Sequence, residues 1–168
     1  MKFVFYAKLA LTGAIILGLE LVASRILIPF FGVSLNVWSS ILAVTLIALA
    51  IGYKFGGYLS NRLTFTNLVT YFVGSGAISA TWLNFSFFSY PILLSSLSNW
   101  GLVAGSITAC LYIIFVPLFV FSSLNSALIA ILSDAKYNNT GNKDHNSGSV
   151  FFTSTIGSVI GVFFVTYF

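Results

Sequence analysis

The stretch LALTGAIILGLELVASRILIPFF, residues 9–31, is an almost unbroken apolar run that contains one acid, Glu20, and one base, Arg25. About 20 mainly apolar residues are enough for a helix to cross the hydrocarbon core of a bilayer. The run is too long for the core of a signal peptide, so it predicts an uncleaved first membrane helix. The helix should end at the sequence Pro29-Phe30-Phe31-Gly32, because proline and glycine both interrupt helices.

The rest of the chain has the same apolar character. Of its 168 residues, 58% are hydrophobic, seven are Lys or Arg and three are Asp or Glu. A water-soluble domain usually needs about a quarter of its residues charged to cover its surface. The composition therefore predicts an all-α polytopic integral membrane protein, and we expect it to lie in the cell membrane of a prokaryote.

The apolar segments predict five transmembrane helices in one domain that covers residues 1–168. Pro91 should close the third segment, and Pro117 should kink or tilt the fourth, which is longer than a crossing requires. The polar stretch 133–149 is rich in Asn, Gly, Lys and Asp and predicts a flexible cytoplasmic loop. The predicted spans are about 9–31, 37–59, 68–90, 102–132 and 150–168.

The loops predict one orientation, with the amino terminus in the cytoplasm and the carboxyl terminus outside. Basic residues lie before the first span, between the second and third spans, and between the fourth and fifth spans. Positive charge favours the cytoplasmic side, so these segments should be cytoplasmic. The two intervening loops, 32–36 and 91–101, carry no charge. Aromatic residues should mark the two membrane boundaries, Trp38 and Trp100 on the outside and Tyr6 and Tyr58 on the inside. The basic residues in the predicted cytoplasmic segments are Lys2, Lys8, Arg62, Lys136 and Lys143.

The amino-acid composition also argues against several classes of function. The few basic residues are scattered, so nucleic-acid binding is not expected despite the net charge of +4. Cys110 is the single cysteine, which excludes an intrachain disulfide and a cysteine metal cluster, and its apolar surroundings predict a packing role. We expect no catalytic residue, no metal site and no cofactor in this chain.

Glu20 is the first candidate functional residue. An acid near the middle of a span costs about 2.5–3.5 kcal/mol on insertion scales, which the apolar neighbours offset. Helical spacing puts Gly13, Glu20, Ala23 and Ser24 on one stripe of small or polar residues, which should face other helices. Two interpretations stay open: a proton or cation site, or an acid that holds helices together through hydrogen bonds.

Arg25 is the second candidate, because it is the one basic residue on the outer side of the charge pattern. It follows Glu20 by five positions, which is about 140° around a helix, so a salt bridge within the helix is not expected. Its side chain can extend to the outer headgroups, which is the default prediction, or bind a partner helix.

Small residues predict close helix packing. The pairs Gly52/Gly56 and Gly157/Gly161 each have the GxxxG spacing that lets two helix backbones approach. Two asparagines within the spans, Asn84 and Asn125, are expected to form hydrogen bonds between helices.

With these residues in place, the sequence resembles the membrane region of spermidine-synthase-like proteins, often described as fused transporter-like and spermidine synthase proteins. The resemblance covers most of the chain in order and is strongest in the first two spans. It is carried by residues 18–27, Phe31-Gly32, Trp38, Gly52-Tyr53, Gly56-Gly57, Asn61-Arg62 and residues 154–161.

The resemblance implies membrane helices that precede an aminopropyltransferase-like domain of methyltransferase fold, and this chain contains no such domain. The sequence departs from the family at Ser122 and Ser126, where a Gly and a Pro are expected after Pro117. Glu20 and Arg25 are the matched positions to carry over, without an assigned role.

Three functional hypotheses follow. The first is a non-catalytic membrane module that anchors or docks an enzyme, such as a soluble aminopropyltransferase-like subunit, or other membrane helices. The second is a small transporter for polyamines or other cations, with Glu20 as the cation or proton site. The third is a structural subunit of a larger membrane complex.

Overall fold

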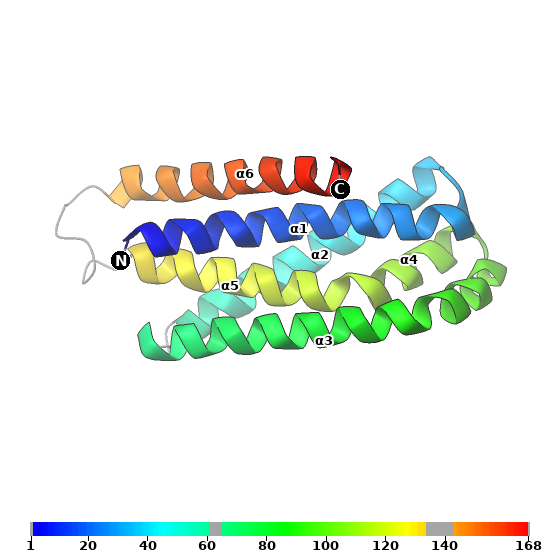
Figure 1. Ribbon diagram of the computed structural model, residues 1–168, viewed down its shortest axis with the longest axis horizontal. Helices are drawn as coiled ribbons and strands as arrows, with labels where there is room; N and C mark the ends of the chain where they lie inside the picture. The colour runs from blue at the N-terminus through cyan, green and yellow to red at the C-terminus, as the bar shows by residue number, and fades with distance from the viewer. Residues whose placement is uncertain (1, 61–64, 134–142, 168) are drawn as a thin grey trace.

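The computed structural model describes residues 2–60, 65–133 and 143–167, and within these ranges the protein is all-α, as predicted. Figure 1 shows an elongated bundle in which α1, α3 and α6 run in one direction and α2, α4 and α5 run in the other. The elements are α1 (Lys2–Phe31), α2 (Leu35–Ser60), α3 (Phe65–Leu97), the 3-10 helix η1 (Ser98–Trp100), α4 (Leu102–Ile113), α5 (Phe115–Ser133) and α6 (Lys143–Tyr167).

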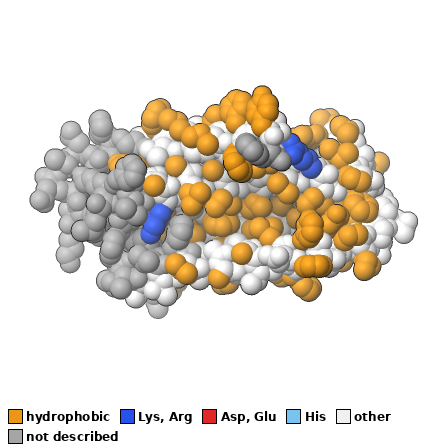
Figure 2. Space-filling model, viewed as in Figure 1, with side chains coloured by type: hydrophobic (Ala, Val, Ile, Leu, Met, Phe, Trp, Pro, Cys, Tyr) orange, Lys and Arg blue, Asp and Glu red, His pale blue; other side chains and the backbone are white. Residues whose placement is uncertain are grey.

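Three described helical stretches are long and apolar enough to cross a membrane: Tyr6–Phe31, Leu35–Ser60 and Val73–Trp100. The bent pair α4–α5 makes a fourth if it is counted as one crossing. The apolar part of α6, Phe151–Tyr167, is shorter than these. On the face shown in Figure 2, hydrophobic side chains cover much of the described surface. The predicted count of five spans therefore remains a prediction.

The first helix ends where the sequence predicts. α1 stops at Phe31, and Gly32 has a φ of 74°, a left-handed conformation that glycine adopts without strain. The Gly32 N–H still donates to the Ile28 carbonyl at 2.9 Å. α2 then begins beside Ser34, whose Oγ accepts a hydrogen bond from the Val37 N–H at 3.4 Å.

Pro91 does not close the third helix, contrary to the sequence prediction. α3 continues through Pro91 to Leu97, and η1 and Gly101 (φ 91°) form the connection instead. Long apolar helices tolerate an internal proline, because neighbouring groups satisfy the backbone positions that the ring disturbs. The predicted outer loop 91–101 is accordingly mostly helical.

The predicted bend near Pro117 is present. α4 and α5 meet at an angle of 53° around Ile114. Pro117 has no N–H to donate to the carbonyl of Ile113, four residues earlier, and its ring collides with that carbonyl. Trp82 of α3 donates a hydrogen bond from Nε1 to the main-chain carbonyl of Tyr112 at 3.0 Å. This carbonyl, next to the bend between α4 and α5, therefore has a donor.

The last helix begins earlier than predicted. α6 starts at Lys143, so the second part of the expected polar loop 133–149 is helical. Residues 134–142 lie outside the described residues, as do Asn61 and Arg62. Lys136, part of the charge pattern behind the predicted orientation, is therefore not placed either.

The core of the bundle lies among α1, α2, α4 and α5, with the end of α3 closing one side. Its centre is formed by fully buried aliphatic side chains from these helices, such as Leu27, Ile41, Leu118 and Leu124. Cys110 also belongs to this core and is fully buried, which confirms its predicted packing role. α6 packs along α1 at the edge of the bundle and buries little beyond Gly157 and Gly161.

Candidate functional site

Glu20 lies near the middle of α1 and is half-buried, on the side of the helix that meets α2. Its carboxyl group lies beside the hydroxyl of Thr45, which is only 3% exposed. The two groups do not reach hydrogen-bond geometry, so Thr45 Oγ1 is buried without a partner. The site therefore combines one partly open carboxyl group with one enclosed hydroxyl group.

The predicted stripe around Glu20 does not face a single neighbour. Gly13 packs against α6, where a Cβ atom would meet Ser154 and Ser158. Ala23 is fully buried toward α3 and α4. Glu20 lies between these two contacts, and this position leaves part of its side chain uncovered.

Arg25 is exposed and contacts α6 rather than Glu20. Its Nη2 donates a hydrogen bond to the main-chain carbonyl of Thr166 at 3.2 Å. Of the two predicted alternatives for Arg25, the structure shows a contact to another helix.

The Gly52/Gly56 pair places α2 directly against α5. A Cβ atom at Gly52 would overlap the Ser122 side chain, and one at Gly56 would overlap the Ser123 main chain. Ser122 Oγ also donates to the Ala48 carbonyl at 3.4 Å. The two backbones are therefore close enough for hydroxyl groups to bond across the interface.

Two serines of α5, Ser122 and Ser126, both lie at this interface. Ser122 is fully buried against Gly52, and Ser126 Oγ donates to the Tyr53 carbonyl at 2.9 Å. Small hydroxyl residues allow close approach and supply a hydrogen bond, so they suit a tightly packed helix pair.

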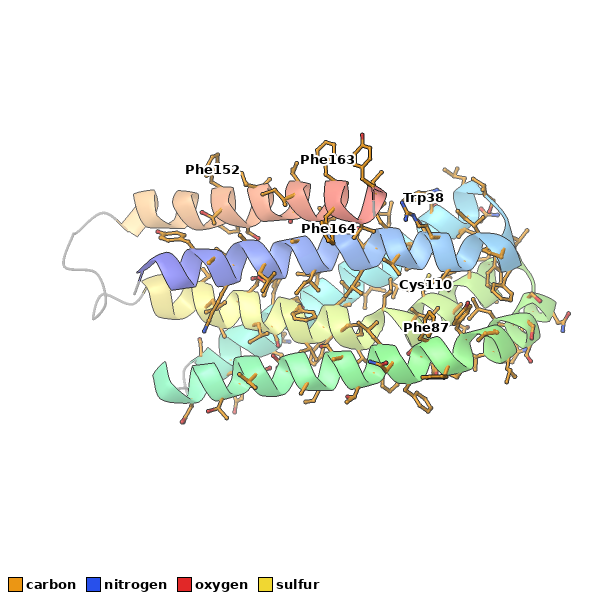
Figure 3. The ribbon with its side chains drawn as sticks, in the orientation of Figure 1. Trp38, Phe87, Cys110, Phe152, Phe163 and Phe164 are labelled. Carbon is orange, nitrogen blue, oxygen red and sulfur yellow. The ribbon has the colours of Figure 1, made fainter. Side chains whose placement is uncertain are left out.

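The Gly157/Gly161 pair places α6 against α1. Added Cβ atoms at these glycines would overlap the main chain at Ala10 and Ala14 respectively. α1 and α6 run in the same direction (Figure 1), so small residues of both helices meet along their lengths. Phe152 and Phe163 point from α6 away from α1 (Figure 3).

Polar side chains link other helices as well. Thr12 Oγ1 of α1 donates to Asn125 Oδ1 of α5, in agreement with the interhelical role predicted for Asn125. Ser40 and Ser106 join α2 to α4 at 2.8 Å. The prediction for Asn84 is wrong: its Nδ2 donates to the Ala80 carbonyl of its own helix at 3.0 Å, because it lies on an exposed face of α3.

Within the described residues, no group of three or more His, Cys, Asp or Glu side chains comes together at metal-binding distance. The Glu20 carboxyl group and the Thr45 hydroxyl group place their oxygen atoms together near the middle of the bundle. Such a pair can accept hydrogen bonds from a partner group or hold a cation. Sequence reasoning found Glu20 but missed Thr45, because nothing in the sequence of residues 37–59 reveals which turn of α2 will lie opposite Glu20.

Comparisons with protein-family models, with curated proteins and with solved structures found no match.

Proposed function

We propose that this chain is a non-catalytic integral membrane module that docks other membrane subunits or anchors an enzyme. In this proposal the helices cross the bilayer with the amino terminus in the cytoplasm and the carboxyl terminus outside. Support for the embedding comes from the apolar exposed surface and from the exposed aromatic residues at opposite ends of α2, Trp38 and Tyr58.

The observation that carries the docking proposal is the partial exposure of Glu20 at the middle of α1. In hydrocarbon an ionised carboxyl group costs about 2.5–3.5 kcal/mol on insertion scales, and intramembrane acids face protein partners or water. The enclosed Thr45 hydroxyl covers one side of the carboxyl group and leaves the other open. A hydrogen-bonding group from a partner helix would cover that open side.

The resemblance to spermidine-synthase-like proteins supports a choice of partner. In that family the membrane helices accompany an aminopropyltransferase-like domain. A separate subunit with that domain, held at the cytoplasmic face, is the enzyme that this module would anchor.

The test uses site-specific photo-crosslinking in native membranes. A photoreactive residue at Leu49, one turn beyond Thr45 on the same face of α2, should capture a discrete partner, and Glu20→Leu should abolish the capture. The same residue at Phe88, which is 82% exposed on α3, is the control and should capture no discrete protein. Equal labelling from both positions, or aminopropyl transfer by the purified chain alone, would reject the docking proposal.

A second candidate function is favoured by the unpartnered Thr45 hydroxyl. Together with the Glu20 carboxylate it provides oxygen atoms for a cation or a protonated amine, as a small polyamine or cation transporter requires. Uptake of labelled spermidine into liposomes tests it: Glu20→Gln and Thr45→Val should each abolish uptake. Thr108→Val is the matched control, because that hydroxyl bonds only the Ala104 carbonyl of its own helix. Uptake that survives in both site variants rejects the transporter.

A further inference from the structure

The bend between α4 and α5 borders a partly open cavity that the Glu20 site does not use. Its volume is about 200 Å³, and α1, α3 and the α4–α5 junction all contribute to it. Ala23 of α1 and Ile113 and Ile114 at the junction form part of the wall, and Leu83 and Ser86 of α3 form the opposite part. Almost all of this lining is apolar.

Ser86 brings a buried hydroxyl group to this wall. It is 3% exposed, and its hydroxyl group has no hydrogen-bond partner. Two other serines on α3 form hydrogen bonds within their own helix. Ser89 Oγ donates to the Phe85 carbonyl at 2.9 Å, and Ser95 Oγ donates to the Ile92 carbonyl at 2.9 Å. A buried hydroxyl group without a partner is destabilising unless something outside the bundle supplies one.

The cavity opens on the outer surface of the bundle between α1 and α3. Val22 and Phe87 line it and are 38% and 67% exposed. Phe87 projects from α3 beside α4 (Figure 3). In the membrane embedding proposed above, this mouth faces lipid tails and not water, so an occupant would enter from the bilayer.

We infer that this cavity binds a lipophile, an uncharged molecule with an apolar body and one oxygen atom that accepts a hydrogen bond from Ser86. A dry cavity of about 150 Å³ lined by Leu, Ile and Phe is enough to bind benzene, so the apolar body has room. The ligand oxygen supplies the acceptor that the Ser86 hydroxyl lacks. The inference rests on the membrane embedding of the proposed function and not on its docking partner.

Trp82 provides a built-in reporter, because it lies one helical turn from Ser86 on α3. Trp38→Phe and Trp100→Phe leave it as the only tryptophan. In nanodiscs, a brominated long-chain alcohol that enters the cavity should quench Trp82 fluorescence with saturation. A brominated alkane without oxygen should quench more weakly. Phosphatidylcholine brominated on its acyl chains is the second arm and tests whether bilayer lipid itself is the occupant.

Two variants separate the cavity from its hydroxyl group. Ala23→Leu fills the cavity and should abolish saturable quenching. Ser86→Ala should weaken binding of the alcohol by about 2–10-fold, the value of one net hydrogen bond, without changing binding of the alkane. Ser79→Ala is the matched control, because Ser79 is also buried without a partner on α3 but does not line the cavity, and it should change neither.

Quenching that rises in proportion to the probe without saturation, or that Ala23→Leu leaves unchanged, would overturn the inference. Equal effects of Ser86→Ala and Ser79→Ala would overturn the assigned hydrogen bond. Ser86→Ala keeps the test decisive if Ala23→Leu fails to fold. A chain that does not enter nanodiscs at all contradicts the proposed membrane embedding, and this result is seen before any probe is added.

Discussion

The guanidinium group of Arg25 on α1 donates a hydrogen bond to the main-chain carbonyl of Thr166 on α6, at 3.2 Å. Thr166 lies in the last described turn of α6. One side chain thus ties α1 to α6 through two residues that are 141 positions apart in the sequence.

Arg25→Gln should loosen the end of α6. Loss of the hydrogen bond to the Thr166 carbonyl costs about 0.5–1.5 kcal/mol, so amides in the last described turn of α6 should exchange with solvent severalfold faster. Hydrogen exchange in detergent micelles measures this effect. Lys54→Gln, at an exposed position on α2, is the control and should leave α6 unchanged. Identical α6 exchange in wild type and Arg25→Gln would contradict a stabilising contact between Arg25 and α6.

Gly157→Ala should separate α6 from α1. The added Cβ atom overlaps the main chain of Ala10, which cannot move aside without moving α1, so a cost of about 1–3 kcal/mol is expected. Spin labels at Leu11 and Phe163, both exposed, should report a longer and broader distance distribution between the helices. Gly148→Ala on the same helix has open space around its Cβ position and should leave the distance unchanged. An unaltered distance in Gly157→Ala would show that the helices are not in close contact.

The hydrogen bond between Thr12 and Asn125 should couple α1 to α5. Thr12→Val and Asn125→Leu, alone and together, form a double-mutant cycle whose coupling energy should be about 0.6 kcal/mol, the average for such bonds in a membrane protein. Unfolding in mixed micelles provides the free energies of unfolding. Thr155→Val, whose hydroxyl bonds the Phe151 carbonyl of its own helix, should show no coupling with Asn125→Leu. Strict additivity of Thr12→Val and Asn125→Leu would disprove the link.

Trp82→Phe should destabilise the junction of α4 and α5. The variant keeps an aromatic ring but leaves the Tyr112 carbonyl without the indole donor, at a cost of about 1–3 kcal/mol for an unsatisfied buried group. The midpoint of thermal unfolding should fall by several degrees. Trp100→Phe, at a position that is 67% exposed, should change the midpoint little. If both variants lower the unfolding midpoint by a similarly small amount, the hydrogen bond from Trp82 does not stabilise the junction of α4 and α5.

The apolar pattern of the sequence was sufficient for the all-α class and for the features that depend on local chemistry. The end of α1 at Gly32 and the bend before Pro117 were predictable because each follows from the backbone of one residue. Pro91 shows the limit of this reasoning, since its neighbours in the bundle, and not its own ring, decide whether the helix continues.

The contacts between helices could not be predicted in the same way. A GxxxG pair identifies a face that can approach another helix but not which helix, so nothing in the sequence assigned Gly157 to α1 or Gly56 to α5. Thr45 and Ser86 were missed for a related reason. A single hydroxyl residue in an apolar run has no sequence signal that distinguishes a satisfied position from an unpartnered one.

The side-by-side pairing of α1 with α6 has a consequence for biosynthesis. Ribosomes add about 5–20 residues per second, so Gly157 is made about 7–29 s after Gly13. In the membrane embedding proposed above, the face of α1 that carries Ala10 and Ala14 is made well before the α6 residues that cover it, and we call this face the small-residue groove. A chaperone, a lipid or a competing peptide could fill the groove first, and a synthetic copy of α6 supplied during translation should trap the nascent protein in an open form.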